Sequence, residues 1–127
     1  MVIFMQKLVE CRLIVNSEIN GIVDNIVVSG KGYCKMEDKG TVVYFMDNDM
    51  KYKYVYNGNE LCVYCNASFY KFIVNKNSVG KIKNGDYIFE VTTFATKIEI
   101  NNNLIILEYN LSQDGSIIGK YKSQLSF

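Results

Sequence analysis

The C-terminal segment 103–127 constrains the fold more than any other part of the chain. Two runs, 104–111 and 116–127, flank a short polar loop that contains Asp114 and Gly115. In each run the apolar residues occupy alternate positions, and successive side chains of a strand point to opposite faces. Glycine accepts a positive φ and aspartate bonds readily to nearby backbone. The segment therefore predicts a β-hairpin whose two strands share an apolar face.

An isolated hairpin is marginally stable in water, so further strands must cover this face. The sequence supplies them, beginning with the alternating run Val9–Val15 and the long run Ile22–Glu37, joined by a predicted turn at Asn20-Gly21. A polar loop is predicted over 75–80 and a bend at Phe94-Ala95. The remaining predicted strands are 41–46, 51–56, 61–66, 69–75, 81–83, 87–93 and 96–100.

Turn signals recur at strand-length intervals, and no long segment has a helical period. This pattern is typical of an all-β sandwich or barrel. No internal repeat, linker or low-complexity tract divides the chain of 127 residues. We therefore predict one domain over 1–127, a single antiparallel β-barrel of about eight to ten strands.

Two glycines, Gly30 and Gly32, fall inside the long predicted strand 22–37. Glycine weakens a strand unless it marks a bend or a close approach of two backbones, and long strands of small barrels need such a point. A phosphate-binding loop would need more glycines and a following helix, neither of which the sequence contains. The pair therefore predicts a bend or a close approach of two backbones.

Composition excludes several classes of chemistry. The chain has no histidine, which is the commonest general base and transition-metal ligand, and its formal net charge is +1. The overall charge gives no case for nucleic acid or an anionic membrane, so neither is expected as a partner. We expect no cofactor.

The N-terminal stretch 1–10 is apolar but too short to span a membrane. Lys7, Glu10 and Arg12 interrupt it where a signal peptide would be apolar. We therefore expect a cytoplasmic protein with reduced cysteines. Arg12 shares strand parity with Glu10, which predicts a surface position rather than an interior carboxylate-binding one.

Cys62 and Cys65 have the spacing of a redox pair or of half a zinc site. Residues three apart in a strand face opposite ways, so the two thiols are not expected to meet. Cys11 and Cys34 stand alone, and no histidine can complete a metal site. We predict no metal and interpret the cysteines as small core residues.

Tyrosines and lysines alternate along the predicted strand 51–56, so its tyrosines face one way and Lys51 and Lys53 the other. A nucleic-acid-binding sheet displays rings and lysines on one surface. Alternation therefore favours an aromatic-lined interior with a solvated lysine face. The predicted ligand-lining residues, including one from the last hairpin, are Tyr52, Tyr54, Tyr56 and Tyr109.

The sequence resembles the YwiB-like family of bacterial proteins, a domain-of-unknown-function family with a calycin-like barrel. The resemblance lies in Gly32-Tyr33 before a turn, in the run Val42–Tyr44, and in Leu107–Leu111 followed by a final strand that ends at Leu125 and Phe127. It covers nearly the whole chain. It implies a lipocalin-like barrel, but no established activity and no catalytic residues.

Three functional hypotheses remain open. The first is a non-enzymatic protein that binds a small apolar or aromatic molecule in the barrel. The second is a protein- or RNA-interaction module that uses an exposed strand edge or the lysine face, and such an edge would also permit a homodimer. The third is an enzyme that uses tyrosine, aspartate or glutamate chemistry, with Glu90 and Glu108 as the residues to test, but nothing in the sequence pairs them as acid and base. We predict no catalytic residue.

Overall fold

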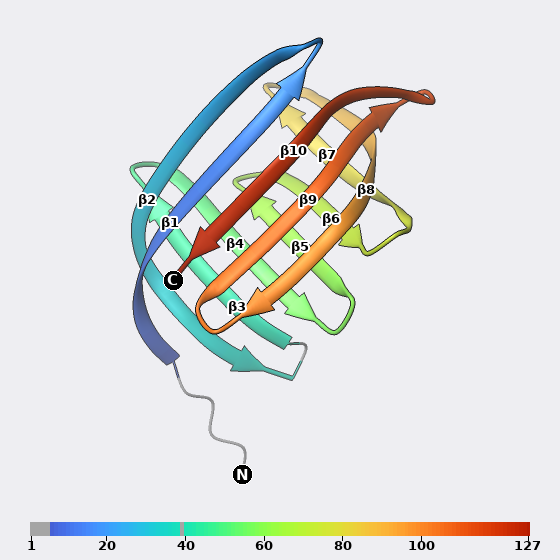
Figure 1. Cartoon of the computed structure of the whole chain (residues 1–127). Helices are drawn as coiled ribbons and strands as arrows, with labels where there is room; N and C mark the ends of the chain where they lie inside the picture. The colour runs from blue at the N-terminus through green and yellow to red at the C-terminus, as the bar shows by residue number, and fades with distance from the viewer. Residues whose placement is uncertain (1–5, 39) are drawn as a thin grey trace.

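The computed structural model describes residues 6–38 and 40–127, and it consists of ten antiparallel strands (Figure 1). The apolar stretch 1–10 and the predicted domain 1–127 therefore lie partly outside the described residues. The strands are β1 Gln6–Ile19, β2 Ile22–Glu37, β3 Gly40–Asp47, β4 Met50–Asn57, β5 Glu60–Cys65, β6 Ser68–Ile73, β7 Asn77–Asn84, β8 Tyr87–Asn101, β9 Leu104–Gln113 and β10 Ser116–Ser126.

The strands close into one barrel. Each strand pairs with its neighbours in sequence, and β1 completes the ring by pairing with β10, for example Leu13 opposite Leu125. The predicted all-β antiparallel barrel is confirmed, with the strand number at the upper end of the predicted range. The predicted turns at Asn20-Gly21 and Asp114-Gly115 are also confirmed. All four of these residues have positive φ, as a two-residue hairpin turn of type I′ requires.

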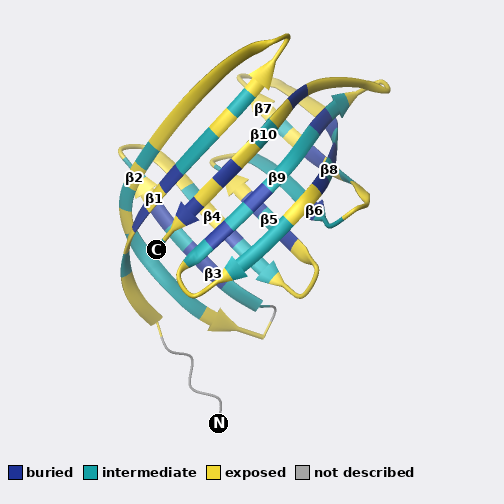
Figure 2. Ribbon diagram, viewed as in Figure 1, coloured by how far each residue is buried: buried dark blue, intermediate teal, exposed yellow. Residues whose placement is uncertain are grey.

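Alternation along the strands divides each wall into an inner and an outer face (Figure 2). The inner face carries a continuous apolar core, in which Phe45 and Leu61 are completely buried. Every strand except β2 and β7 contributes at least one buried member. The buried members of the core are Cys11, Leu13, Val43, Phe45, Tyr54, Leu61, Val63, Phe72, Ala95, Ile105, Leu107 and Leu125.

The two glycines of β2 allow it to approach β3 closely. A Cβ added at Gly30 would overlap the carbonyl oxygen of Met46, and one added at Gly32 would overlap that of Tyr44. No other residue type fits such a backbone approach. The interpretation of these glycines as a point of close approach is confirmed.

The sequence prediction is wrong at two places. Residues 77–80, predicted as loop, belong to β7, and the predicted bend at Phe94-Ala95 is instead a bulge inside one long strand, β8, between Ala95 and Lys97. The reason is that polar residues suit a strand with one solvated face, as β7 has. The bulge inserts one residue, which turns Ile98 back toward the core.

Two hairpins extend past the ring of paired strands. β3 pairs with β2 only over Lys31–Glu37, so within the described residues 22–30 pair with β1 alone. Similarly, β9 pairs with β8 only from Thr92 onward, which leaves the β7–β8 turn projecting. Both turns and the β9–β10 turn lie at the top in Figure 1. We refer to this end of the barrel as the mouth.

No helix in the part of the chain that the structure describes is long and apolar enough to cross a membrane.

Candidate functional site

All four tyrosines predicted to line a ligand site face the barrel interior. Tyr54 is almost fully buried, between Val43 and Val63 on the flanking strands. Tyr52 stacks on Phe45 with ring centroids 4.8 Å apart. The structure does not bring all four predicted tyrosines together, although each lies in or against the core. The four are Tyr52, Tyr54, Tyr56 and Tyr109.

Tyr56 is separate from the other three. It lies two residues further along β4 than Tyr54, away from the mouth, opposite Thr41 and Leu61. The Tyr54 hydroxyl instead lies close enough to those of Tyr109 and Tyr52 for both to raise its pKa. The predicted set therefore splits into a group of three and one remote member.

Sequence reasoning missed two tyrosines that complete this group. Tyr121 stacks on Tyr109 with centroids 4.9 Å apart and an interplanar angle of 11°. Phe72 packs against Tyr109 at 4.6 Å and against Tyr70 at 6.2 Å. Strand parity could have identified them, because Tyr70 shares a face with the buried Phe72 and Tyr121 shares a face with the buried Leu125. We define the tyrosine cluster as Tyr52, Tyr54, Tyr70, Tyr109 and Tyr121.

The tyrosine cluster remains protonated at neutral pH. Burial raises the pKa of the Tyr54 and Tyr109 hydroxyls above the usual value, and neighbouring phenols raise it further. Burial also raises the pKa of Tyr70 and Tyr121. A charged phenolate would lose its hydration inside the barrel, so the neutral form is favoured. The cluster is thus a set of neutral hydroxyl groups, each able to donate or accept a hydrogen bond.

Cys65 belongs to the same region. Its side chain is hydrogen-bonded to the Tyr52 hydroxyl, and burial raises the pKa of its thiol. A thiol with a raised pKa is a poor nucleophile at neutral pH because little thiolate is present. This residue therefore contributes a small polar contact to the wall of the site.

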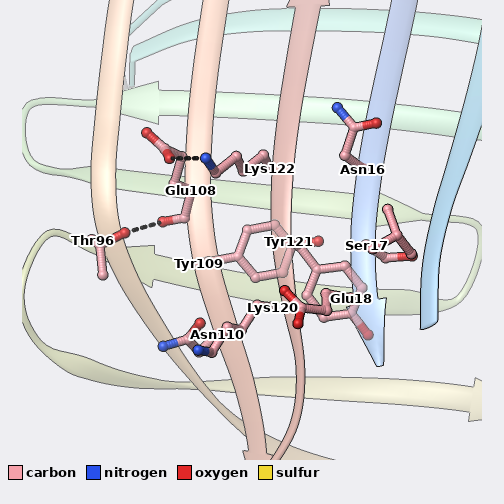
Figure 3. Close-up of a pocket in the computed structure, with 11 residues that line it drawn as sticks. Asn16, Ser17, Glu18, Thr96, Glu108, Tyr109, Asn110, Lys120, Tyr121 and Lys122 are labelled. Carbon is pink, nitrogen blue, oxygen red and sulfur yellow. Dashed lines mark hydrogen bonds and ion pairs between the residues drawn. The ribbon is translucent and has the colours of Figure 1, made fainter. Parts of the chain in front are cut away.

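A pocket of about 320 Å³ lies where β1, β9 and β10 approach the mouth (Figure 3). Two members of the tyrosine cluster, Tyr109 and Tyr121, line it together with Ser17 from the inner face. Its volume lies at the lower end of the range for small-molecule sites. The rest of the lining is mostly polar and faces outward, and it consists of Asn16, Glu18, Val23, Thr96, Glu108, Asn110, Lys120 and Lys122.

Apolar residues on the inner face of the projecting hairpins remain exposed at the mouth (Figure 2). Ile22 is 71% exposed and Tyr87 is 72% exposed, although both share parity with core residues of their strands. A Cβ at Gly119 would lie 2.9 Å from the Tyr121 hydroxyl and 3.0 Å from Ile19, so this rim adjoins the tyrosine cluster. We define the apolar rim as Ile19, Ile22, Ile26, Tyr87 and Phe89.

The two glutamates considered for catalysis both face outward. Glu90 is exposed on β8. Glu108 is half-buried and forms ion pairs with Lys122 at 3.5 Å and Lys97 at 3.9 Å, while its backbone carbonyl accepts a hydrogen bond from the Thr96 hydroxyl. The structure does not bring the two carboxylates together as an acid and a base.

Strand alternation correctly separates Cys65, which faces the interior, from Cys62, and all four cysteines are free. The interpretation of the cysteines as small core residues is wrong for Cys62, because it shares the outer face with Lys71 and Glu60 and lies outside the core. Among the described residues no group of cysteines and carboxylates could hold a metal ion. Cys11 is buried, and burial raises the pKa of its thiol to about 11. Arg12 is exposed on the outer face of β1.

One step of the sequence argument about the lysine face is wrong. Lys51 and Lys53 do face outward, opposite in direction to the tyrosines of their own strand. However, the Lys53 ammonium lies 5.7 Å from the ring centroid of Tyr64, which the neighbouring strand β5 contributes to the same outer face. Alternation within one strand separates the two residue types, but pairing between strands brings them together.

Comparisons with known proteins identify a fold but no family. No family model and no curated protein sequence matches this chain. Its structure is similar to the crystal structure of ywiB protein from Bacillus subtilis, with a TM-score of 0.77 at 13% sequence identity. The match covers 95% of this chain and 92% of that chain. At this identity the likeness establishes a shared barrel fold alone.

Proposed function

We propose that this protein is a non-enzymatic binding protein that takes a small, largely apolar or aromatic molecule at the mouth of the barrel. The observation that carries the proposal is the apolar rim next to the tyrosine cluster. The rim consists of inward-facing residues left in water, and five neutral phenols lie beneath it. Small-molecule sites typically combine an apolar wall with a few placed polar groups.

The position of the ligand follows from the packing. Phe45, Phe72 and Leu107 fill the middle of the barrel, so a ligand would sit above them rather than deep inside. Its apolar body would cover the apolar rim, and its polar group would reach the hydroxyls of Tyr109 and Tyr121 beside the pocket. Burying the rim would remove apolar surface from water, which favours binding by about 25 cal/mol per Å² before the costs of association are subtracted.

The proposal extends to the family and the location of the protein. We infer a lipocalin-like barrel of the YwiB-like family in the cytoplasm of a bacterium. The structural likeness over 95% of the chain supports it, as do the residues Gly32 and Tyr44 at the close approach of β2 and β3. A homodimer through the open edge of residues 22–30 stays a prediction.

Native mass spectrometry tests the proposal on protein purified gently from its own kind of cell. We expect a reproducible small-molecule adduct at one per chain, and the mass of this adduct would begin to identify the ligand. Ile26→Ser should reduce the fraction of adduct because it makes an exposed part of the apolar rim polar. An adduct retained equally by this variant would place the ligand elsewhere and contradict the proposed site.

A further inference from the structure

The outer face of strands β2 to β7 carries a row of aromatic and cationic side chains. Each member of the row lies directly opposite the next on the neighbouring strand. With strands about 4.8 Å apart, a row across six strands extends over about 24 Å. In order from β2, the row consists of Tyr33, Tyr44, Lys53, Tyr64, Phe69 and Lys81.

The rings in this row lie close to one another and to lysines. Tyr33 and Tyr44 stack with centroids 5.1 Å apart, and Lys35 lies 5.4 Å from the Tyr33 centroid. Tyr64 and Phe69 are also 5.1 Å apart. Tyr64 is 38% exposed, so its ring is open to solvent. The row therefore presents aromatic surface flanked by positive charge.

Lysines outnumber carboxylates on this face. Lys35 pairs with Glu37 and Lys71 with Glu60, while Glu10 and Glu90, on the two flanking strands, stand opposite Lys31 and Lys81. Among the described residues, the exposed lysines that take part in no ion pair on this face are Lys31, Lys51, Lys53, Lys81 and Lys83.

The opposite side of the barrel differs. There Lys97 bridges Glu99 at 3.3 Å and Glu108 at 3.9 Å, and Lys122 bridges Glu108 at 3.5 Å. The positive charge of these two lysines is thus locally neutralised. The net charge of +1 for the whole chain therefore does not reveal that lysines gather on the outer face of β2–β7.

We propose that the outer face of β2–β7 binds single-stranded nucleic acid. The rings of the row stack bases, and the unpaired lysines on either side neutralise phosphates. Sequence-tolerant single-strand binding combines these two features, a positively charged surface and aromatic platforms. An acidic peptide would use the lysines but would have no need of the rings. The site lies outside the barrel and is independent of a ligand at the mouth.

Fluorescence anisotropy with a labelled single-stranded oligouridylate of about a dozen nucleotides tests this site at low ionic strength. We expect saturable binding that weakens as salt rises. Tyr64→Ala should weaken binding at least about fivefold, the lower limit for loss of one base-stacking platform, whereas Tyr64→Phe should retain it. Retention by the phenylalanine variant would distinguish stacking from a hydroxyl contact.

The lysines are tested by charge-matched variants. Lys51→Ala combined with Lys53→Ala should reduce the slope of log K against log salt by about 1.4, since each phosphate contact on a single strand contributes about 0.7. Lys97→Ala also removes a positive charge, but from β8, where Lys97 pairs with Glu99 and Glu108, and it should leave the slope unchanged. Equal weakening by Lys53→Ala and Lys97→Ala would mean that only net charge matters, which would overturn the proposal.

Poly-glutamate as competitor separates the two classes of partner. If it displaces the oligonucleotide efficiently and Tyr64→Ala has no effect, the face is an acidic-protein site and the nucleic-acid proposal is wrong. No saturable binding of the oligonucleotide by the wild-type protein would also overturn it.

Discussion

Among the ionisable side chains of the inner wall, buried cysteine and tyrosine have pKa values raised above their ordinary range. Burial raises the pKa of the Cys11 thiol from 9.0 to about 11, and it raises the pKa of Tyr54 and Tyr109 above their ordinary value. In each case the folded state favours the protonated form. The unfolded chain ionises these groups more readily, so alkaline pH favours unfolding.

We expect the free energy of unfolding to be independent of these groups below about pH 8.5 and to fall as pH rises through 9 toward 11. Urea denaturation at a series of pH values measures this dependence. Between pH 9 and 10 the fall should be shallower in Cys11→Ala than in the wild type, even if that variant is less stable at pH 7. An identical slope in the two proteins would show that this thiol is not protected from ionisation.

At the scale of the strand, β2 depends on its two glycines. Gly30→Ala would place a methyl group on the carbonyl oxygen of Met46, and two packed backbones cannot easily separate to accept it. We expect a loss of about 1–3 kcal/mol or more in the free energy of unfolding, as for other overpacked sites. Ser29→Ala, at the exposed neighbouring position, should change it by less than about 0.5 kcal/mol. Equal urea midpoints for the two variants would contradict the close approach.

Strand alternation and turn residues were sufficient to predict most of these elements. The hairpin of β9 and β10 and the limits of β2 could be predicted because apolar residues alternate and because glycine, asparagine or aspartate marks the turns. Residues 77–80 of β7 could not be predicted, because their polar side chains also suit a loop. An irregularity at Phe94-Ala95 was predicted, but the sequence of one strand does not show that it is a bulge, because the bulge arises from pairing with β9.

The candidate site was predictable only in part, for reasons of register. Parity places Tyr52, Tyr54 and Tyr109 inside the barrel, but it does not show that Tyr56 lies apart or that Tyr121 stacks on Tyr109. The lysine face shows the same limit. Only the pairing of β4 with β5 places Tyr64 beside Lys53, and the sequence of one strand does not contain that register.

At the scale of the whole molecule, barrel closure separates two environments. The inner wall combines an apolar core with neutral phenols and opens at the apolar rim. On the outer wall, lysines gather over β2–β7, and ion pairs link Lys97, Glu108 and Lys122 across β8, β9 and β10. A ligand at the mouth and a polyanion on the outer wall would therefore contact different faces of the same strands. The two proposals can be tested separately on one protein.

The measurement that tests the central claim most directly is a titration with a neutral aromatic dye, N-phenylnaphthylamine, whose fluorescence rises in apolar surroundings. We predict one saturable site per chain, weakened at least about tenfold in Ile26→Ser combined with Tyr121→Phe, because apolar contact and a hydroxyl are both lost. Tyr56→Phe, the same change on an inward tyrosine away from the mouth, should bind like the wild type. No saturable binding, or equal affinity in all three proteins, would contradict a ligand site at the mouth.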